Sequence, residues 1–264
     1  MLKNEGNRLT RVAVCSPRKE YALGKNDLAH NLGNLGNPED AINQHDSLKA
    51  ELKAFGCEVI DLNELDGHPN SVFTRDTSLM TPEGYIQLRL GIDTRLGEGN
   101  WMGETLANLG LPLAGQIIAP GSVEGGDVVL AGNVAFVGQS IRTNAEGIRQ
   151  LSAILEPMGY EMRVIPLPDN ILHLDKVLLT IAPNTLLYCP NYVPAEMVKG
   201  FDTVEIECGG DTTANMICLG DNNVLVNASN QIVIEKLRAR GMIVHVLDLE
   251  EFAKGMGGPN CLIM

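Results

Sequence analysis

Residues 125–138 read GGDVVLAGNVAFVG, in which two short apolar runs flank a Gly-Asn turn. Two such runs joined by a turn of this type predict a β-hairpin. Three further segments have the same form, namely residues 75–88 (RDTSLMTPEGYIQL), 173–189 (HLDKVLLTIAPNTLLYC) and 213–227 (TANMICLGDNNVLVN). Their leading polar residues, Asp76, Asp127, Asp175 and Asn215, are 51, 48 and 40 positions apart. The chain therefore repeats one hairpin unit, and residues 11–23 are expected to form a fifth, less regular copy.

Amphipathic helices are predicted between these hairpins, each followed by another apolar strand. In residues 38–55, Asn37 can cap the helix, Pro38 suits its first turn and Gly56 ends it before the strand CEVIDL. Similar patterns predict helices after Asn144 and Ser229, one around residues 104–109 before a strand at 116–119, and a short one at residues 195–199.

The repeating unit is thus strand, strand, helix, strand. One ββαβ unit cannot bury its own apolar face, so the units are expected to pack side by side in a closed ring. The predicted fold class is α/β, a five-bladed αβ propeller. No Pro-, Gly- or Ser-rich linker divides the chain, which predicts one domain over residues 1–264. An ordinary two-layer α/β sandwich is the alternative.

The composition of the chain limits the classes of molecule that it could bind. The chain has 264 residues, with 20 Lys and Arg against 33 Asp and Glu, a net charge of −13. This charge and the single Trp argue against nucleic acid, which needs a positive face and exposed aromatic side chains. A small cationic ligand fits better.

The cysteine pattern and the apolar segments bear on the compartment. Six cysteines without a C-x-x-C pair are not typical of a disulfide framework or a zinc cluster, which indicates a reducing compartment. Residues 177–196 are interrupted by three prolines, so no membrane span is expected, and no signal peptide is apparent. We therefore expect a cytoplasmic protein, and a homo-oligomer stays open. Cysteines expected to be small buried residues are Cys15, Cys57, Cys189, Cys208 and Cys218.

Titratable residues cluster where the hairpins begin. Glu124 and Asp127 flank a Gly-Gly pair, and His173 and Asp175 share one face because strand side chains alternate. Near the end of the sequence, Cys261 follows a glycine-rich turn, where a nearby histidine or cation that lowers the pKa of its thiol would make it a nucleophile. Motifs for nucleotide phosphates, serine nucleophiles and zinc proteases are missing from the sequence. The sequence therefore predicts chemistry without a cofactor or metal.

In this order, Phe-Thr-Arg75-Asp76, Glu124-Gly-Gly-Asp127, His173-Leu-Asp175 and Gly-Gly-Pro-Asn-Cys261 resemble the motifs of the guanidine-modifying penteins. These include arginine deiminase and dimethylarginine dimethylaminohydrolase. The resemblance covers nearly the whole chain and implies the same five-bladed propeller.

The resemblance also implies roles. Cys261 would attack the guanidinium carbon, His173 would act as general acid and then base, and Glu124 would orient His173. Asp76 and Asp175 would hold the guanidinium nitrogens. The remaining substrate-binding residues would be Arg95 and Arg142, at the substrate carboxylate, and Asp127, with residues 24–37 as a mobile lid.

Two subfamilies compete. The short chain resembles the dimethylarginine hydrolases, whereas Asp175 resembles arginine deiminase, because the methylarginine enzymes often have Lys there. The expected activity is hydrolysis of arginine or an N-methylated arginine, through a covalent thiouronium, to citrulline and ammonia or a methylamine. An amidinotransferase and a non-catalytic pentein binding module are the alternatives.

Overall fold

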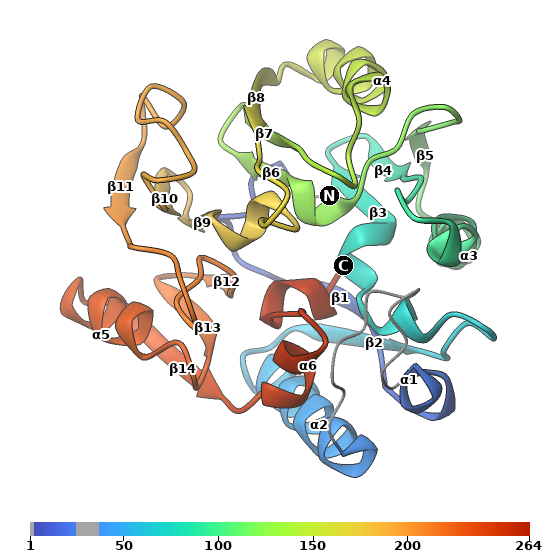
Figure 1. Ribbon diagram of the computed structural model, residues 1–264, viewed down its shortest axis with the longest axis horizontal. Helices are drawn as coiled ribbons and strands as arrows, with labels where there is room; N and C mark the ends of the chain where they lie inside the picture. Colours follow the sequence, from blue (N-terminus) through green and yellow to red (C-terminus); the bar gives the residue numbers. More distant parts are fainter. Residues whose placement is uncertain (1–2, 25–36) are drawn as a thin grey trace.

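The computed structural model describes residues 3–24 and 37–264, which form five small sheets around a common centre (Figure 1). In four sheets the first two strands are antiparallel and the third runs parallel to the second, with the second strand in the middle. The remaining sheet has two parallel strands. The ring of ββαβ units confirms the five-bladed αβ propeller predicted from the repeats.

The strands follow the ring in sequence order. The sheets contain β1 (Arg11–Cys15) and β2 (Glu58–Leu62); β3 (Ser78–Thr81), β4 (Gly84–Gln87) and β5 (Leu113–Gln116); β6 (Val128–Ala131), β7 (Val134–Gln139) and β8 (Glu161–Pro166); β9 (Leu178–Ala182), β10 (Thr185–Tyr188) and β11 (Asp202–Glu205); and β12 (Ile217–Gly220), β13 (Asn223–Asn227) and β14 (Ile243–Leu247).

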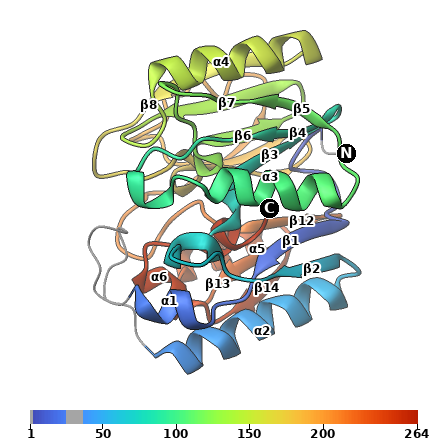
Figure 2. The ribbon, with the colours of Figure 1, turned by 90° about the vertical axis from the view of Figure 1, so that its right-hand side faces the viewer.

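Helices α2 to α5 lie on the outside of the ring (Figures 1 and 2). Asn37 caps α2 by accepting a hydrogen bond from the Glu39 amide, and Asn144 caps α4 through the Gly147 amide, as their positions predicted. The α-helices are α1 (Lys19–Leu23), α2 (Pro38–Ala54), α3 (Glu98–Asn108), α4 (Ala145–Leu155), α5 (Gln231–Ala239) and α6 (Glu250–Lys254). Short 3-10 turns are η2 (Pro69–Val72), η3 (Thr74–Thr77), η4 (Asp93–Arg95), η5 (Gly125–Asp127), η6 (Glu156–Met158), η7 (Leu174–Lys176) and η8 (Pro259–Leu262).

Three sequence predictions of secondary structure were wrong. Residues 19–23 form helix α1 instead of a second strand, because KEYAL consists largely of good helix formers. Residues 195–199 form turns without a helix, since Pro194 and Gly200 leave too short a segment between them. Strand β5 lies at Leu113–Gln116, before the predicted position, because the turn at Gly110 ends the helical segment and directs the chain onto β4.

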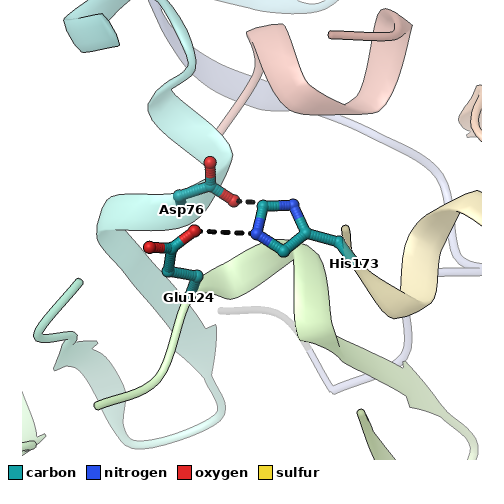
Figure 3. Close-up of side chains that lie close together, drawn as sticks. All are labelled: Asp76, Glu124 and His173. Atoms are coloured by element: carbon teal, nitrogen blue, oxygen red, sulfur yellow. Dashed lines mark hydrogen bonds and ion pairs between the residues drawn. The ribbon is translucent and has the colours of Figure 1, made fainter. Parts of the chain in front are cut away.

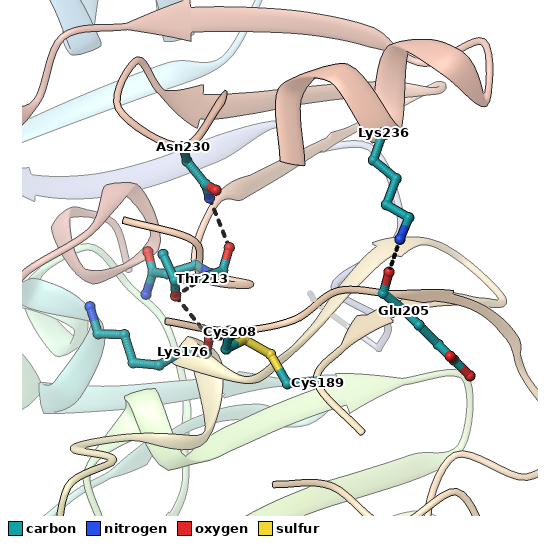
Figure 4. Close-up of a disulfide and its surroundings, with 8 residues drawn as sticks. Lys176, Cys189, Glu205, Cys208, Thr213, Asn230 and Lys236 are labelled. Atoms are coloured by element: carbon teal, nitrogen blue, oxygen red, sulfur yellow. Dashed lines mark hydrogen bonds between the residues drawn. A yellow bond between two sulfur atoms is a disulfide. The ribbon is translucent and has the colours of Figure 1, made fainter. Parts of the chain in front are cut away.

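Cys189 and Cys208 are joined by a disulfide (Figure 4), which corrects their expected role as separate buried thiols. Cys189 follows β10 and Cys208 follows β11, and these strands are parallel neighbours. Their Cα atoms are therefore 5.8 Å apart despite a separation of 19 positions. The other three cysteines of that group, Cys15, Cys57 and Cys218, are free and buried, as expected.

Apolar side chains fill the space between the sheets and the outer helices, while polar side chains occupy the centre. Within the third sheet, β6 and most of β7 are fully buried and belong to two core clusters, one of which includes Leu151 and Leu155 of α4. The packed blades thus form a rigid frame around a polar centre. In the described part of the chain, no helix is both long enough and apolar enough to cross a membrane.

Candidate active site

The 3-10 turns that precede the hairpins meet at the centre of the ring. Turn η3 contacts η5 and η8, and η5 contacts η7. Since these turns carry the polar residues that lead each hairpin, their side chains converge. The structure therefore brings together the five central residues singled out from the sequence: Asp76, Glu124, His173, Asp175 and Cys261, all of them buried.

His173 lies between two carboxylates (Figure 3). Its Nε2 is 2.7 Å from Oε2 of Glu124, and its Nδ1 is 3.8 Å from Oδ1 of Asp76. The ring packs closely over the backbone of Gly126, where an added Cβ would lie 2.6 Å from Nδ1. A glycine in η5 is thus required for the imidazole to reach this position.

The two carboxylates favour an imidazolium. Burial alone lowers the pKa of His173, but the charges of Asp76, Asp127 and Glu124 outweigh it and raise the pKa to about 9. Burial likewise raises the pKa of Glu124, yet the hydrogen bond and charge of His173, with two arginines, hold it well below its usual range. The resting site therefore contains a His173–Glu124 ion pair.

This ion pair predicts a pH-dependent stability. Because the folded-state pKa of His173 lies above its unfolded value of 6.5, its contribution is complete below about pH 6.5 and disappears as the pH rises through about 9. The shift corresponds to about 3 kcal/mol in the free energy of unfolding. We expect the stability advantage of the wild type over His173→Gln to shrink by this order between about pH 6 and pH 10. Urea unfolding at both pH values measures the difference in the free energy of unfolding between the two proteins. A difference that does not change with pH would contradict the ion pair.

The thiol of Cys261 lies among polar groups from two other segments, turn η7 and the loop that precedes β12. Its Sγ is 3.4 Å from Nδ2 of Asn215, 3.9 Å from Nζ of Lys176 and 3.9 Å from Oδ2 of Asp175. Burial raises the pKa of this thiol to about 11, the Lys176 charge opposes the rise, and Asp175 and Asp76 add to it. The free protein therefore holds Cys261 mainly as a neutral thiol near neutral pH.

The two carboxylate oxygens of Asp175 differ in their hydrogen bonding. Oδ2 accepts a hydrogen bond of 3.0 Å from Nδ2 of Asn260, whereas Oδ1 is buried and has no hydrogen-bond partner among the described residues. A buried carboxylate oxygen without a donor is costly, so such an atom in a carboxylate 3.9 Å from the Cys261 thiol indicates a ligand that donates to it.

The two arginines expected to bind a substrate carboxylate have different surroundings. Arg95 donates through Nε and Nη2 to Glu98 and through Nη1 to Asp76. Among the described residues, Arg142 donates only through Nη1, to Glu124, at 3.2 and 3.3 Å. Both guanidinium groups line the central cavity, and Arg142 retains more N–H groups for a ligand.

Asp127 lies outside this cavity. Its Oδ1 accepts a hydrogen bond from the Leu174 amide and its Oδ2 accepts one from the Ser140 hydroxyl. Burial raises the pKa of Asp127 to about 6, although His173 and Ser140 lower it. With both oxygens engaged, Asp127 joins turn η7 to its neighbours, a structural arrangement that differs from the substrate contact expected from the sequence.

The central cavity is narrow, about 30 Å³, and is lined by residues from four of the blades and from the glycine-rich segment near Cys261. Its walls contain Asn70, Phe73, Asp76, Arg95, Arg142, Leu172, His173, Gly255, Met256, Gly257 and Cys261. A larger cavity of about 480 Å³ shares Asn260 with the site's surroundings but contains none of Glu124, His173 and Cys261. The expected lid, residues 24–37, lies almost wholly outside the described residues.

The donor atoms of Asp76, Glu124 and His173 lie close enough together to reach one metal ion. An imidazolium has no lone pair for a metal, and the charges around His173 favour that protonated form. The arrangement therefore favours a proton over a metal on His173 near neutral pH.

Three residues of the site were missed by the sequence analysis: Lys176 and Asn215, which contact Cys261, and Asn260, which contacts Asp175. Asn215 leads the fourth hairpin, as Asp76 and Asp175 lead theirs, and that equivalence was a usable signal. Lys176 directly follows the His-x-Asp motif, but nothing in the sequence indicates that it faces a cysteine 85 positions away.

A buried His–Glu ion pair, a nearby thiol and a ring of carboxylates at the centre of a five-bladed αβ propeller define a guanidine-modifying pentein. Residues 25–264 match a family model described as N,N dimethylarginine dimethylhydrolase, eukaryotic. The chain belongs to this family, and it is a C–N hydrolase that acts on guanidino amidines.

Individual relatives agree with this assignment. An N(G),N(G)-dimethylarginine dimethylaminohydrolase from Pseudomonas aeruginosa is 33% identical over 230 residues, which cover 86% of this chain and 90% of the relative. An arginine deiminase from Listeria monocytogenes is 27% identical, covering 76% of this chain and 62% of the relative. A crystal structure of a Cys-to-Ser mutant of the Pseudomonas aeruginosa dimethylarginine enzyme with citrulline superimposes with a TM-score of 0.85 at 29% identity, covering 97% of this chain and 99% of that one.

Proposed function

We propose that this protein hydrolyses the guanidino group of arginine or an N-methylated arginine to the ureido group of citrulline, releasing ammonia or a methylamine. The observation that carries the proposal is the buried Oδ1 of Asp175, which receives no hydrogen bond from residues 3–24 and 37–264 and belongs to a carboxylate 3.9 Å from the Cys261 thiol. A planar guanidinium supplies N–H donors in the arrangement that such a carboxylate accepts.

Charge supports a cationic substrate. Asp76 lies in turn η3 and Asp175 in turn η7, and the charges of both raise the pKa of Cys261. A guanidinium bound between these carboxylates would compensate their charge and favour the thiolate. Arg142 would hold the substrate carboxylate, and Arg95 would keep Asp76 in place through the 2.7 Å bond to its Oδ2.

In the first step, Sγ of Cys261 attacks the guanidinium carbon and forms a C–S bond. His173 protonates the departing nitrogen as its C–N bond breaks, which leaves a thiouronium on the enzyme. Glu124 stabilises the imidazolium and holds its Nε2, so Nδ1 faces the reacting atoms.

In the second step, the now neutral His173 takes a proton from water, and the hydroxide adds to the thiouronium carbon. The C–S bond then breaks as the new hydroxyl group loses its proton to solvent, which releases citrulline with its C=O group and returns the electron pair to Sγ of Cys261. One residue can act as acid and then as base because its pKa, raised to about 9, lies close to the working pH.

Asp175 bears on the choice of substrate. A carboxylate oxygen accepts hydrogen bonds from N–H groups and offers no apolar surface to a methyl group. We therefore assign to Asp175 a terminal guanidino nitrogen that carries no methyl group. Arginine, monomethylarginine and asymmetric dimethylarginine each have such a nitrogen, whereas symmetric dimethylarginine has none.

The test is citrulline formation from each of these four compounds, assayed separately. We expect turnover of compounds with an unmethylated terminal nitrogen and little turnover of symmetric dimethylarginine. If none of the four yields citrulline, the proposed hydrolysis is wrong. Loss of the amidino group to an added amine without citrulline would indicate an amidinotransferase.

The carboxylate itself is tested by replacing Asp175. Asp175→Asn keeps an acceptor for Asn260 but loses the charge, so we expect kcat/KM for arginine to fall roughly 10- to 100-fold. Asp175→Lys should abolish arginine turnover, because its ammonium repels the guanidinium. Asp202→Asn, an exposed carboxylate on β11 of the same blade, is the matched control. Unchanged kinetics in Asp175→Lys would show that this residue does not contact the substrate.

We also propose the cytoplasm as the compartment. The mechanism requires a free thiol at Cys261, and this cysteine, with Cys15, Cys57 and Cys218, is unpaired. A reducing environment maintains such thiols, whereas a disulfide such as Cys189–Cys208 is uncommon in that environment.

A further inference from the structure

Lys176 places an ammonium group beside the thiol that the proposed mechanism requires. Its Nζ lies 3.9 Å from Sγ of Cys261. Among the described residues, no carboxylate forms an ion pair with Lys176, so its charge is not already compensated by one. An ammonium group that faces a thiol favours the thiolate, and here it opposes the effect of the surrounding carboxylates.

The backbone holds Lys176 in this position. Its carbonyl accepts hydrogen bonds from the Thr213 hydroxyl and the Ala214 amide, both at 2.8 Å. The Thr213 carbonyl in turn accepts a hydrogen bond from Nδ2 of Asn230 (Figure 4). Turn η7, which carries Lys176, is therefore attached to the loop that precedes β12.

The same loop also holds the cysteine. Oδ1 of Asn215 accepts a hydrogen bond of 3.0 Å from the Asn260 amide, and Nδ2 of Asn215 is 3.4 Å from Sγ of Cys261. Gly258 approaches this side chain so closely that an added Cβ would lie 2.3 Å from its Oδ1. Residues 213–215 thus join the backbone of Lys176 to that of Cys261 and set the distance between ammonium and thiol.

The charged groups around Cys261 have opposing effects. Asp175 from η7 and Asp76 from η3 disfavour a negative sulfur, and His173 lines the same cavity. Lys176 is a cation within hydrogen-bond distance of Sγ, and Asn215 adds a neutral N–H donor to the same atom. These two donors oppose the carboxylates before any substrate is bound.

We propose that Lys176 is a catalytic residue of this enzyme, whose ammonium group, together with the Asn215 amide, stabilises the thiolate of Cys261. This inference rests on the proposed function, in which Cys261 is the nucleophile. Ionisation breaks the S–H bond and releases one proton to solvent, while the electron pair stays on sulfur. The ammonium group of Lys176 then compensates the negative charge on sulfur until this electron pair forms the C–S bond with the substrate.

Alkylation of Cys261 by iodoacetamide in the absence of substrate tests the proposal, because the thiolate is the reacting form. Peptide mass spectrometry quantifies the modified Cys261 from about pH 6 to pH 11. We expect Lys176→Met to slow alkylation at about pH 8 by roughly tenfold, and Lys176→Arg to restore most of the rate. Lys199→Met, an exposed lysine of the same blade, should have no effect.

A second readout keeps the proposal testable if the cavity hinders the reagent or Lys176→Met folds poorly. Thiolate ultraviolet absorbance, taken as the difference from Cys261→Ser, reports the same ionisation, and Lys176→Gln removes the charge while keeping a polar end. A folded Lys176→Met or Lys176→Gln protein with wild-type alkylation and thiolate titration would overturn the proposal. If instead the thiolate shifts as expected but no guanidino compound is hydrolysed, the proposed function fails and the role of Lys176 in ionisation stands.

Discussion

Cys261→Ser should abolish citrulline formation, with kcat lowered by roughly 10⁴-fold or more, as for nucleophile removal in other covalent enzymes. A serine hydroxyl is a far weaker nucleophile than a thiolate, and the surrounding carboxylates Asp76 and Asp175 would oppose its ionisation further. The measurement is steady-state citrulline production, supported by intact-protein mass spectrometry for the covalent adduct, which should be missing from the variant.

The control for this change is Cys57→Ser, another buried cysteine, whose Sγ contacts the Glu58 carbonyl away from the site. It should retain wild-type turnover. Thermal unfolding of both variants separates lost chemistry from lost folding. Undiminished activity in a folded Cys261→Ser protein would exclude the covalent mechanism altogether.

His173→Gln should lower kcat by roughly 10³- to 10⁴-fold, because both steps lose their proton-transfer group. Glutamine can keep a hydrogen bond to Glu124 but cannot exchange a proton near neutral pH. In the wild type with saturating substrate, where the bound guanidinium favours the thiolate, deprotonation of His173 removes the general acid, so kcat should fall as the pH rises through about 9. The residual activity of the variant should lack this dependence.

His245→Gln is the matched control for His173. His245 also contacts a glutamate, Glu51, and an asparagine, Asn223, but it lies on β14 away from the central cavity. Its replacement should leave kcat and the pH profile unchanged. A His173→Gln enzyme within about threefold of wild-type kcat would mean that another group transfers the protons.

The ring could be predicted from the sequence because its units are local. In each hairpin the turn residues and apolar runs lie within about 15 positions, so short-range pattern is sufficient to recognise them. The errors have two causes. Residues 19–23 form a helix because KEYAL consists largely of good helix formers, a local signal that analogy with the other hairpins outweighed. The position of β5 depends on its pairing with β4, and no short window contains that contact.

In the candidate site, too, the residues in short motifs could be predicted, whereas their contacts with distant residues could not. Asp76, Glu124, His173, Asp175 and Cys261 belong to motifs that a sequence displays, and a closed ring necessarily brings the start of each hairpin to its centre. Two further residues that contact Cys261 belong to no such motif. Lys176 contacts Cys261 across 85 positions and Asn215 contacts it across 46.

By itself, therefore, the sequence determined the repeat and the ring, and it singled out Glu124, His173 and Cys261 as central residues, because each belongs to a short segment. Only the tertiary structure decided that Asp127 joins two turns, that no described residue donates to Oδ1 of Asp175, and that Lys176 faces the thiol. These features depend on side-chain contacts between distant segments, and such contacts exist only after the blades have packed around their common centre.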